Sequence, residues 1–184
     1  GLYLYRLIKL HRRGRSFFPC ESRRQELFDS VCDELDIERG CVALRQSYEV
    51  QVPEFSGAFH PCTVLPVEEY SDEELRVIFI HELTHYRQRD IWIKHLISLA
   101  LILHFFNPAV WWLHRLFGRW SEYACDKSAS RRAGGMKPYF SVLSGIAGEQ
   151  GGLEFYLAAR LAENKNELLD RVEYMRRMNA RKKG

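Results

Sequence analysis

The sequence has 184 residues, of which 46% are hydrophobic and 28% are charged. This length and composition suit one domain with a hydrophobic core, which excludes the disordered and fibrous classes. The net charge is only +3, but basic residues concentrate in residues 1–24 and 176–183. Because no groove-like pattern of interleaved aromatic residues accompanies these basic clusters, we expect no direct contact with nucleic acid.

Cysteine usage indicates a reducing compartment. The count is odd, no CxxC pair occurs and the spacings are irregular, which is untypical of a disulfide framework. We therefore expect free thiols at all five positions, which are Cys20, Cys32, Cys41, Cys62 and Cys125.

The first residues, GLYLYRLIKLHRRGR (1–15), allow two interpretations. An apolar stretch followed by a basic cluster is how a transmembrane helix leaves the membrane on its cytoplasmic side. The alternative is an amphipathic helix with an exposed basic face. No complete span is present, because the longest apolar run, LISLALILHFF (96–106), is shorter than the roughly 20 residues that a spanning helix needs.

The next elements combine one helix with short strands. Residues 21–39 place apolar side chains at helical spacing, and Gly40 can end that helix. Residues 41–52 alternate partly and predict one or two strands, while CTVLP (62–66) predicts another. Residues 53–61 are expected to form a loop.

The second half is expected to be helical. Ser71 and Glu74 form the pattern of a capping box, which predicts a helix over 71–90 that continues through 91–106. Asn107 and Pro108 start another helix that reaches residue 133. Two more helices are predicted at 138–148 and 153–180. The fold class is therefore α+β and mainly helical, with a small N-terminal β-sheet.

The stretch HELTHYRQRD (81–90) lies inside the predicted helix 71–90. His81 and His85 stand four residues apart, so both imidazoles lie on one helical face and can bind one zinc ion. Glu82 follows the first histidine, where a carboxylate is placed to act as general base toward water. The alternative is a helix that packs two histidines without metal, but two buried imidazoles without partners would be costly.

A zinc site of this kind needs a third protein ligand. A third histidine six residues after His85 is absent, because Ile91 occupies that position, and Gln88 replaces the glycine of the extended motif. The remaining choice is a carboxylate from the later stretch WSEYACDKSA (120–129). Glu122 and Asp126 share a helical face, so one can bind the metal while the other holds a ligand histidine.

HELTHYRQRD, FNPAVWWLHRLF and SEYACDKSA together resemble the membrane-bound zinc metalloproteases of the BlaR/MecR type. The resemblance covers most of residues 40–131 and, more loosely, the whole chain. It implies a gluzincin-like zincin domain that binds one Zn²⁺ per chain through His81, His85 and Glu122. It also implies that Glu82 is the base and that Asp126 orients His81.

The resemblance further implies a place in the cell and a domain division. Residues 1–20 are expected to end a transmembrane helix and continue as a basic juxtamembrane segment. Residues 21–180 form the zinc metalloprotease domain, and 181–184 are a basic tail that leads to a further span. The domain then faces the cytoplasm at a bacterial cell membrane, attached through segments outside this chain, and Gly1 and Gly184 are fragment ends.

The substrate site is less defined by sequence. In such proteases an extended peptide pairs with an edge strand, and Phe55, Ser56, Gly57 and Ala58 are its expected rim; the alternative is a plain connecting loop. Stabilisation of the oxyanion is open among Tyr123, His114, Arg115 and Arg119.

The expected function is a zinc endopeptidase of a signal transducer. Its substrate would be a protein or peptide, such as a transcriptional repressor or the chain itself. The alternative is a catalytically silent signalling or scaffold module that keeps the fold. The presence of Glu82 argues against that alternative. A general base is not needed for folding, so a domain that had lost catalysis would be expected to lose this glutamate first. A basic nucleic-acid-binding domain is a third and more distant interpretation.

Overall fold

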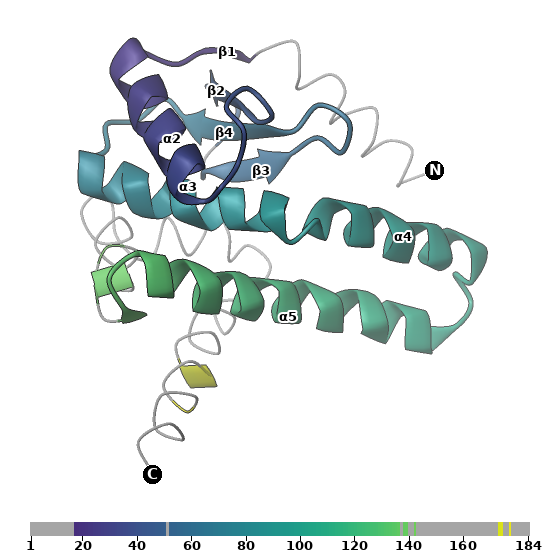
Figure 1. The fold of residues 1–184 in the computed structure, drawn as a ribbon. Helices are drawn as coiled ribbons and strands as arrows, with labels where there is room; N and C mark the ends of the chain where they lie inside the picture. The colour runs from purple at the N-terminus through teal and green to yellow at the C-terminus, as the bar shows by residue number, and fades with distance from the viewer. Residues whose placement is uncertain are drawn as a thin grey trace.

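The computed structural model describes residues 17–50, 52–136, 138–139, 142, 173–174 and 177. Figure 1 shows a small sheet and helix α2 on one side of helix α3, and helix α5 on the other side. This is an α+β arrangement, as predicted from the sequence. The predictions for 1–16, for the tail 181–184 and for most of the two C-terminal helices fall outside the described residues.

The sheet has four strands in the order β1-β2-β4-β3. Strand β4 (Cys62–Pro66) is fully buried and pairs in parallel with β2 (Ala43–Ser47), so that Ala43 lies opposite Cys62. Strands β1 (Phe18–Pro19) and β3 (Glu54–Ser56) form the edges and pair antiparallel. The predictions of β2 and β4 are confirmed, whereas the prediction of a loop over 53–61 is wrong because β3 lies there.

Helix α2 (Ser22–Glu34) buries Phe28, Val31 and Cys32, as its apolar spacing predicts. It ends earlier than expected, because Asp36 adopts a left-handed conformation with φ of 55°. An aspartate tolerates this conformation better than most residues. The prediction that the helix continues to Gly40 is therefore wrong.

Helix α3 (Asp72–Arg87) is the central element. Both halves of its predicted capping box are present: the Ser71 side chain accepts from the backbone of Glu74, and the Glu74 side chain accepts from the backbone of Ser71. Phe79 packs edge-on against Phe28 of α2, with ring centroids 5.1 Å apart. The main core cluster surrounds this contact, so α3 is fixed against both the sheet and α2.

The chain breaks between α3 and helix α4 (Asp90–Leu103), contrary to the prediction that one helix runs on through 91–106. Arg89 adopts a left-handed conformation with φ of 57°, which interrupts the helical backbone. In a continuous helix, a residue five positions on would lie about 140° around the axis from its partner. The break instead turns Asp90 back toward His85.

Helix α5 (Pro108–Arg132) begins where it was predicted, with the Asn107 side chain accepting from the backbone of Ala109. It runs back along α4 and then along α3, so α4 and α5 form a helical hairpin (Figure 1). Among the described residues, no helix has both the length and the hydrophobicity to cross a membrane. Large apolar side chains nevertheless remain exposed along this hairpin, namely Trp92, Ile93, Leu96, Leu99, Ile102, Leu103, Phe105, Phe106, Trp111, Trp112, Leu113 and Trp120.

The five cysteines are free thiols, as the sequence analysis expects. Burial raises the pKa of Cys32 and of Cys62 to about 11, so both thiols stay protonated near neutral pH.

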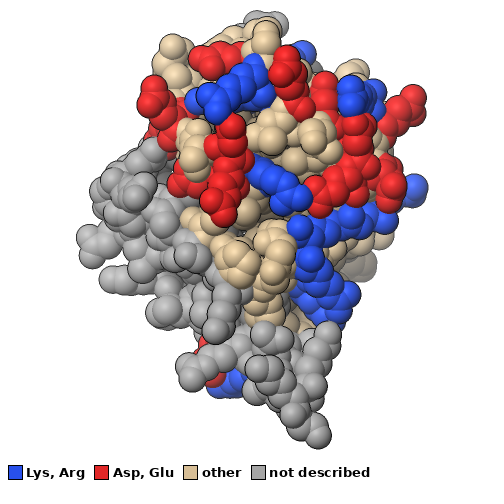
Figure 2. Space-filling view, turned by 60° about the vertical axis from the view of Figure 1, so that its left-hand side comes forward, with Lys and Arg blue, Asp and Glu red and all other residues tan. Residues whose placement is uncertain are grey.

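The face formed by α2 and the start of α3 carries interspersed charges rather than a field of one sign (Figure 2). Arg76 of α3 pairs with Glu34 of α2 at 2.5 Å, and Arg23 pairs with Asp72 at 2.7 Å. These pairs are solvent-exposed, so water and salt screen them and they contribute little to stability.

Candidate metal centre

Two histidine nitrogens meet between α3 and α5. The Nε2 atoms of His81 and His85 lie 3.3 Å apart, and both side chains are buried. Zinc binds imidazole nitrogen at about 2.0–2.1 Å, so two imidazoles on one tetrahedral ion place their nitrogens about 3.3 Å apart. The pair is therefore spaced as one tetrahedral ion requires.

The outer nitrogen of His85 is held by a carboxylate. Its Nδ1 lies 2.7 Å from Oδ2 of Asp90, which also accepts a hydrogen bond of 2.6 Å from the hydroxyl of Ser121. An ionised carboxylate only accepts, so His85 carries its proton on Nδ1 and leaves the Nε2 lone pair for a metal. Asp90 is the first residue of α4, and Ser121 lies on α5 directly before Glu122. The hydrogen bond between them therefore links the two helices next to the expected third ligand.

Asp90 favours its ionised form although its side chain is buried. Burial raises the pKa of this carboxyl, but the hydrogen bonds from His85 and Ser121 outweigh burial and bring the pKa below its usual value. Asp90 is therefore a carboxylate at neutral pH, which is the state that accepts the proton of His85.

The outer nitrogen of His81 is held through a tyrosine. The hydroxyl of Tyr139 lies 2.7 Å from Nδ1 of His81 and donates to Oδ1 of Asp126 at 2.9 Å. The hydroxyl oxygen then accepts from Nδ1–H, which leaves Nε2 of His81 free of a proton. Asp126 lies 3.5 Å from Nδ1, so its link to His81 runs mainly through Tyr139.

The carboxylate of Glu122 faces both inner nitrogens. Its two oxygens lie 3.7 Å from Nε2 of His81 and 3.7 Å from Nε2 of His85. Two neutral imidazoles and one carboxylate around a shared point match the His₂Glu donor set of catalytic zinc sites. The residues present therefore fit the predicted zinc ion.

Cys125 offers a competing third donor. His81, His85 and Cys125 supply ligand atoms that lie within 4.8 Å of one another. The thiol, however, donates to the backbone carbonyl of His81 at 3.2 Å, and its sulfur lies 3.6 Å from Nδ1 of the His81 ring. Because Nδ1 already contacts Tyr139, we favour Glu122 as the third donor.

Glu82 is buried on α3 beside this centre, with 3% of its surface exposed. It lies one position after His81, about 100° around the helix from that histidine. This spacing directs its side chain away from the direction of His81, to the side of the face that carries both histidines.

Comparison with known proteins places the chain in a family of peptidases. The family model described as BlaR1 peptidase M56 matches residues 5–175, which is most of the chain. The chain belongs to the BlaR1 peptidase M56 family. It is also 31% identical, over 87 residues, to the protein named "Regulatory protein BlaR1" of Bacillus licheniformis; the match covers 46% of this chain and only 14% of that relative.

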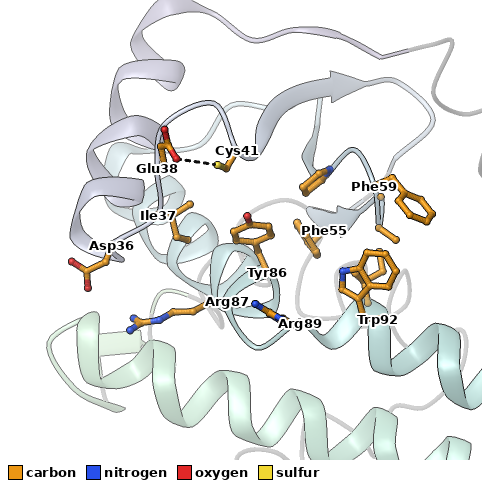
Figure 3. A pocket seen from close by; sticks show the side chains of 14 residues that line it. Asp36, Ile37, Glu38, Cys41, Phe55, Phe59, Tyr86, Arg87, Arg89 and Trp92 are labelled. Atoms are coloured by element: carbon orange, nitrogen blue, oxygen red, sulfur yellow. Dashed lines mark hydrogen bonds between the residues drawn. The ribbon is translucent and has the colours of Figure 1, made fainter.

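In this member of the M56 family, the predicted substrate rim lies beside a pocket of about 570 Å³. Phe55, Gly57 and Ala58 line it, while Ser56, the last residue of β3, does not (Figure 3). Gly57 has φ of 85°, and a side chain there would meet the carbonyl oxygen of His60 at 2.1 Å. The glycine therefore serves the tight turn of its own loop.

The four candidates for oxyanion stabilisation all lie on α5 but differ in their distance along the sequence from Glu122. His114 and Arg115 are exposed and precede Glu122 by seven or eight residues, about two helical turns. Arg119 and Tyr123 are nearer in sequence, and the ring of Tyr123 stacks on Tyr174 at 4.3 Å.

Sequence reasoning missed Asp90, Ser121 and Tyr139. Asp90 ends the stretch HELTHYRQRD, but a residue five positions after a histidine points away from it in an unbroken helix. The break at Arg89 was the missing information. Ser121 is polar next to the expected ligand Glu122, which is a weak signal, and Tyr139 lies in another element with no sequence signal.

Proposed function

We propose that this chain is the zinc-dependent endopeptidase domain of a membrane signal transducer. The observation that carries the proposal is the donor set: two imidazole Nε2 atoms 3.3 Å apart, both faced by the carboxylate of Glu122. Membership of a peptidase family supports the same reading. The ligands would be His81, His85 and Glu122, with one Zn²⁺ per chain.

The buried hydrogen bonds prepare these ligands. Asp90 and Ser121 fix the ring of His85, while Asp126 acts on His81 through Tyr139. Such partners set the tautomer and orientation of a ligating histidine and raise its basicity. When bound, zinc would acidify a water molecule and polarise the scissile carbonyl.

Glu82 is the proposed general base and acid. Its carboxylate accepts a proton from the attacking water and then passes it to the nitrogen of the leaving amine. Because Glu82 is buried, its carboxylate is shielded from bulk solvent and its proton transfers are directed to the attacking water and the leaving amine.

The proposed membrane setting is supported by the α4–α5 hairpin. Residues 91–121 contain no aspartate or glutamate, whereas Lys94, Arg115 and Arg119 flank the exposed apolar side chains. An apolar surface with a basic border suits an anionic membrane surface. A cytoplasmic orientation and a repressor as substrate, or self-cleavage, follow from the BlaR/MecR resemblance and remain part of the proposal.

The test is the variant Glu82→Gln, assayed on casein beside the native chain loaded with zinc. Removing a general base lowers the rate by about 10² to 10⁴, while the histidines and Glu122 still hold the metal. We expect zinc content to be unchanged and proteolysis to be lost. Unchanged proteolysis would refute the role of Glu82, and no proteolysis by the native chain would favour a silent signalling module.

A further inference from the structure

A pocket lies between strand β3, the C-terminal end of α3 and the loop after α2 (Figure 3). Its walls are largely aromatic. Phe55 of β3 meets Tyr86 of α3 edge-on, with ring centroids 6.0 Å apart, and Phe59 meets Trp92 edge-on at 5.1 Å. A volume of about 570 Å³ is large enough for one bulky side chain with adjoining backbone.

Two of these rings are exposed at the mouth of the pocket. Phe59 is 81% exposed and Trp92 is 47% exposed. Exposed aromatic rings around a hollow are a mark of binding surfaces, because they lose contact with water only when a partner arrives.

The rim does not favour a charged ligand. Arg87 and Arg89, from the end of α3 and the residues after it, and Asp36 and Glu38, from the loop after α2, all line the pocket, so the two signs are balanced. In Figure 3, Phe59 and Trp92 occupy the end opposite Asp36. Selection in this pocket would therefore depend on apolar area rather than on charge.

Strand β3 gives an extended ligand a way to bind. In the described part of the chain, β3 pairs with β4 alone and is an edge of the sheet. An extended peptide can add to such an edge through backbone hydrogen bonds, with alternate side chains directed to one face. Phe55 links this edge to the pocket, because it belongs to β3 and lines the wall.

One wall of the pocket comes from the same helix as the proposed base, because Tyr86 of α3 lines it. Tyr86 follows Glu82 by four residues, so the two share one helical face, one turn apart. A peptide paired with β3 would thus pass both the pocket and the proposed base.

We propose that this aromatic pocket is the subsite for a large apolar side chain of an extended peptide that pairs with β3. The inference rests on the proposed endopeptidase function and adds the chemical class of side chain that the site selects. A substrate segment would be extended, and it would carry a bulky apolar residue at the position that enters the pocket.

The test uses the full chain with Glu82→Gln, so that the probe is not consumed. The probes are fluorescein-labelled peptides of alternating threonine and valine that differ only in a central phenylalanine, leucine, alanine or aspartate. Fluorescence anisotropy measures their dissociation constants. We expect the phenylalanine and leucine peptides to bind at least about tenfold more tightly than the alanine and aspartate peptides, as burial of a large apolar side chain predicts.

Two variants change the pocket in opposite ways. Trp92→Ala removes one wall and Ala58→Trp fills the space, and both should abolish the preference for phenylalanine. Trp111→Ala is the matched control, because Trp111 is also 47% exposed but lies on α5 outside the pocket. Zinc content and thermal unfolding of each variant confirm that the fold is kept.

Equal binding of all four peptides, or equal effects of Trp92→Ala and Trp111→Ala, would overturn the inference. A dimer that Trp92→Ala converts to a monomer would also overturn it, since a second copy would then cover the pocket. Casein cleavage by the native chain without peptide preference contradicts only the subsite. A peptide preference without cleavage contradicts only the endopeptidase proposal.

Discussion

At the scale of single residues, the candidate metal centre depends on side chains that bind the outer nitrogens of the two histidines. His85 contacts Asp90 through Nδ1, and Asp90 in turn accepts from Ser121. Helical spacing predicted His81, Glu82 and His85, because positions one and four residues apart in one helix are a local property. It left the third donor open between Glu122 and Asp126, and the BlaR/MecR resemblance selected Glu122. The sequence did not supply Asp90 or Tyr139, because their positions depend on a backbone break and on a distant segment.

Asp90→Ala should weaken zinc binding. Removing the partner frees the ring of His85 to rotate and to change tautomer, and loss of such a partner costs about 10- to 100-fold in metal affinity. Competition with a chromogenic chelator measures the change. Asp72→Ala is the control, because Asp72 is an exposed aspartate in the first turn of α3 and should leave the affinity unaltered. Equal affinities of Asp90→Ala and the native chain would show that Asp90 does not position His85.

At the scale of elements, α3 and α5 show why the helices were predictable. Short sequence patterns predict where both helices begin, namely Ser71 with Glu74 and Asn107 with Pro108. Both patterns form the expected N-terminal caps. The strand β3 and the end of α3 were not predictable in the same way. β3 is three residues long and depends on pairing with β4, while the end of α3 depends on one left-handed residue, Arg89.

The conformation of Arg89 gives a prediction for this junction. Arg89→Gly should leave stability unchanged or raise it slightly, because glycine adopts positive φ without strain. Arg89→Val should lower the free energy of unfolding by about 1–2 kcal/mol, since a β-branched residue is strained there. Urea unfolding measures both.

Arg87→Val is the matched control, because Arg87 is an exposed arginine in the last helical turn. Its cost should stay below about 0.7 kcal/mol, the range of ordinary helix propensities. Similar losses for Arg87→Val and Arg89→Val would contradict a special role for the backbone at Arg89.

At the scale of the whole molecule, the α4–α5 hairpin joins two properties. Its inner end supplies Asp90, Ser121 and Glu122 to the metal centre, and its outer part exposes a broad apolar surface. Soluble monomers seldom expose contiguous apolar patches of this kind without a function. In the proposed membrane setting, attachment at this surface would hold the candidate metal centre at a fixed distance from the membrane.

Vesicle flotation tests this arrangement. We expect the native chain to float with vesicles that contain anionic lipid, and the double variant Leu103→Asp/Phe106→Asp to float at least about tenfold less, because two exposed apolar side chains no longer enter the membrane. Val67→Asp is the control, since Val67 is an exposed apolar residue outside the hairpin. Equal flotation of all three proteins would contradict the membrane surface assigned to the hairpin.

The most direct measurement of the account is the zinc content of the purified full chain, determined by elemental analysis beside three variants. The account predicts about one zinc per native chain, loss of zinc in His85→Ala and Glu122→Gln, and retention in Cys125→Ser. If Glu122→Gln retains zinc and Cys125→Ser loses it, the third ligand is the thiol of Cys125 and not Glu122. A native chain that binds no stoichiometric zinc after incubation with the ion would contradict the metal centre itself.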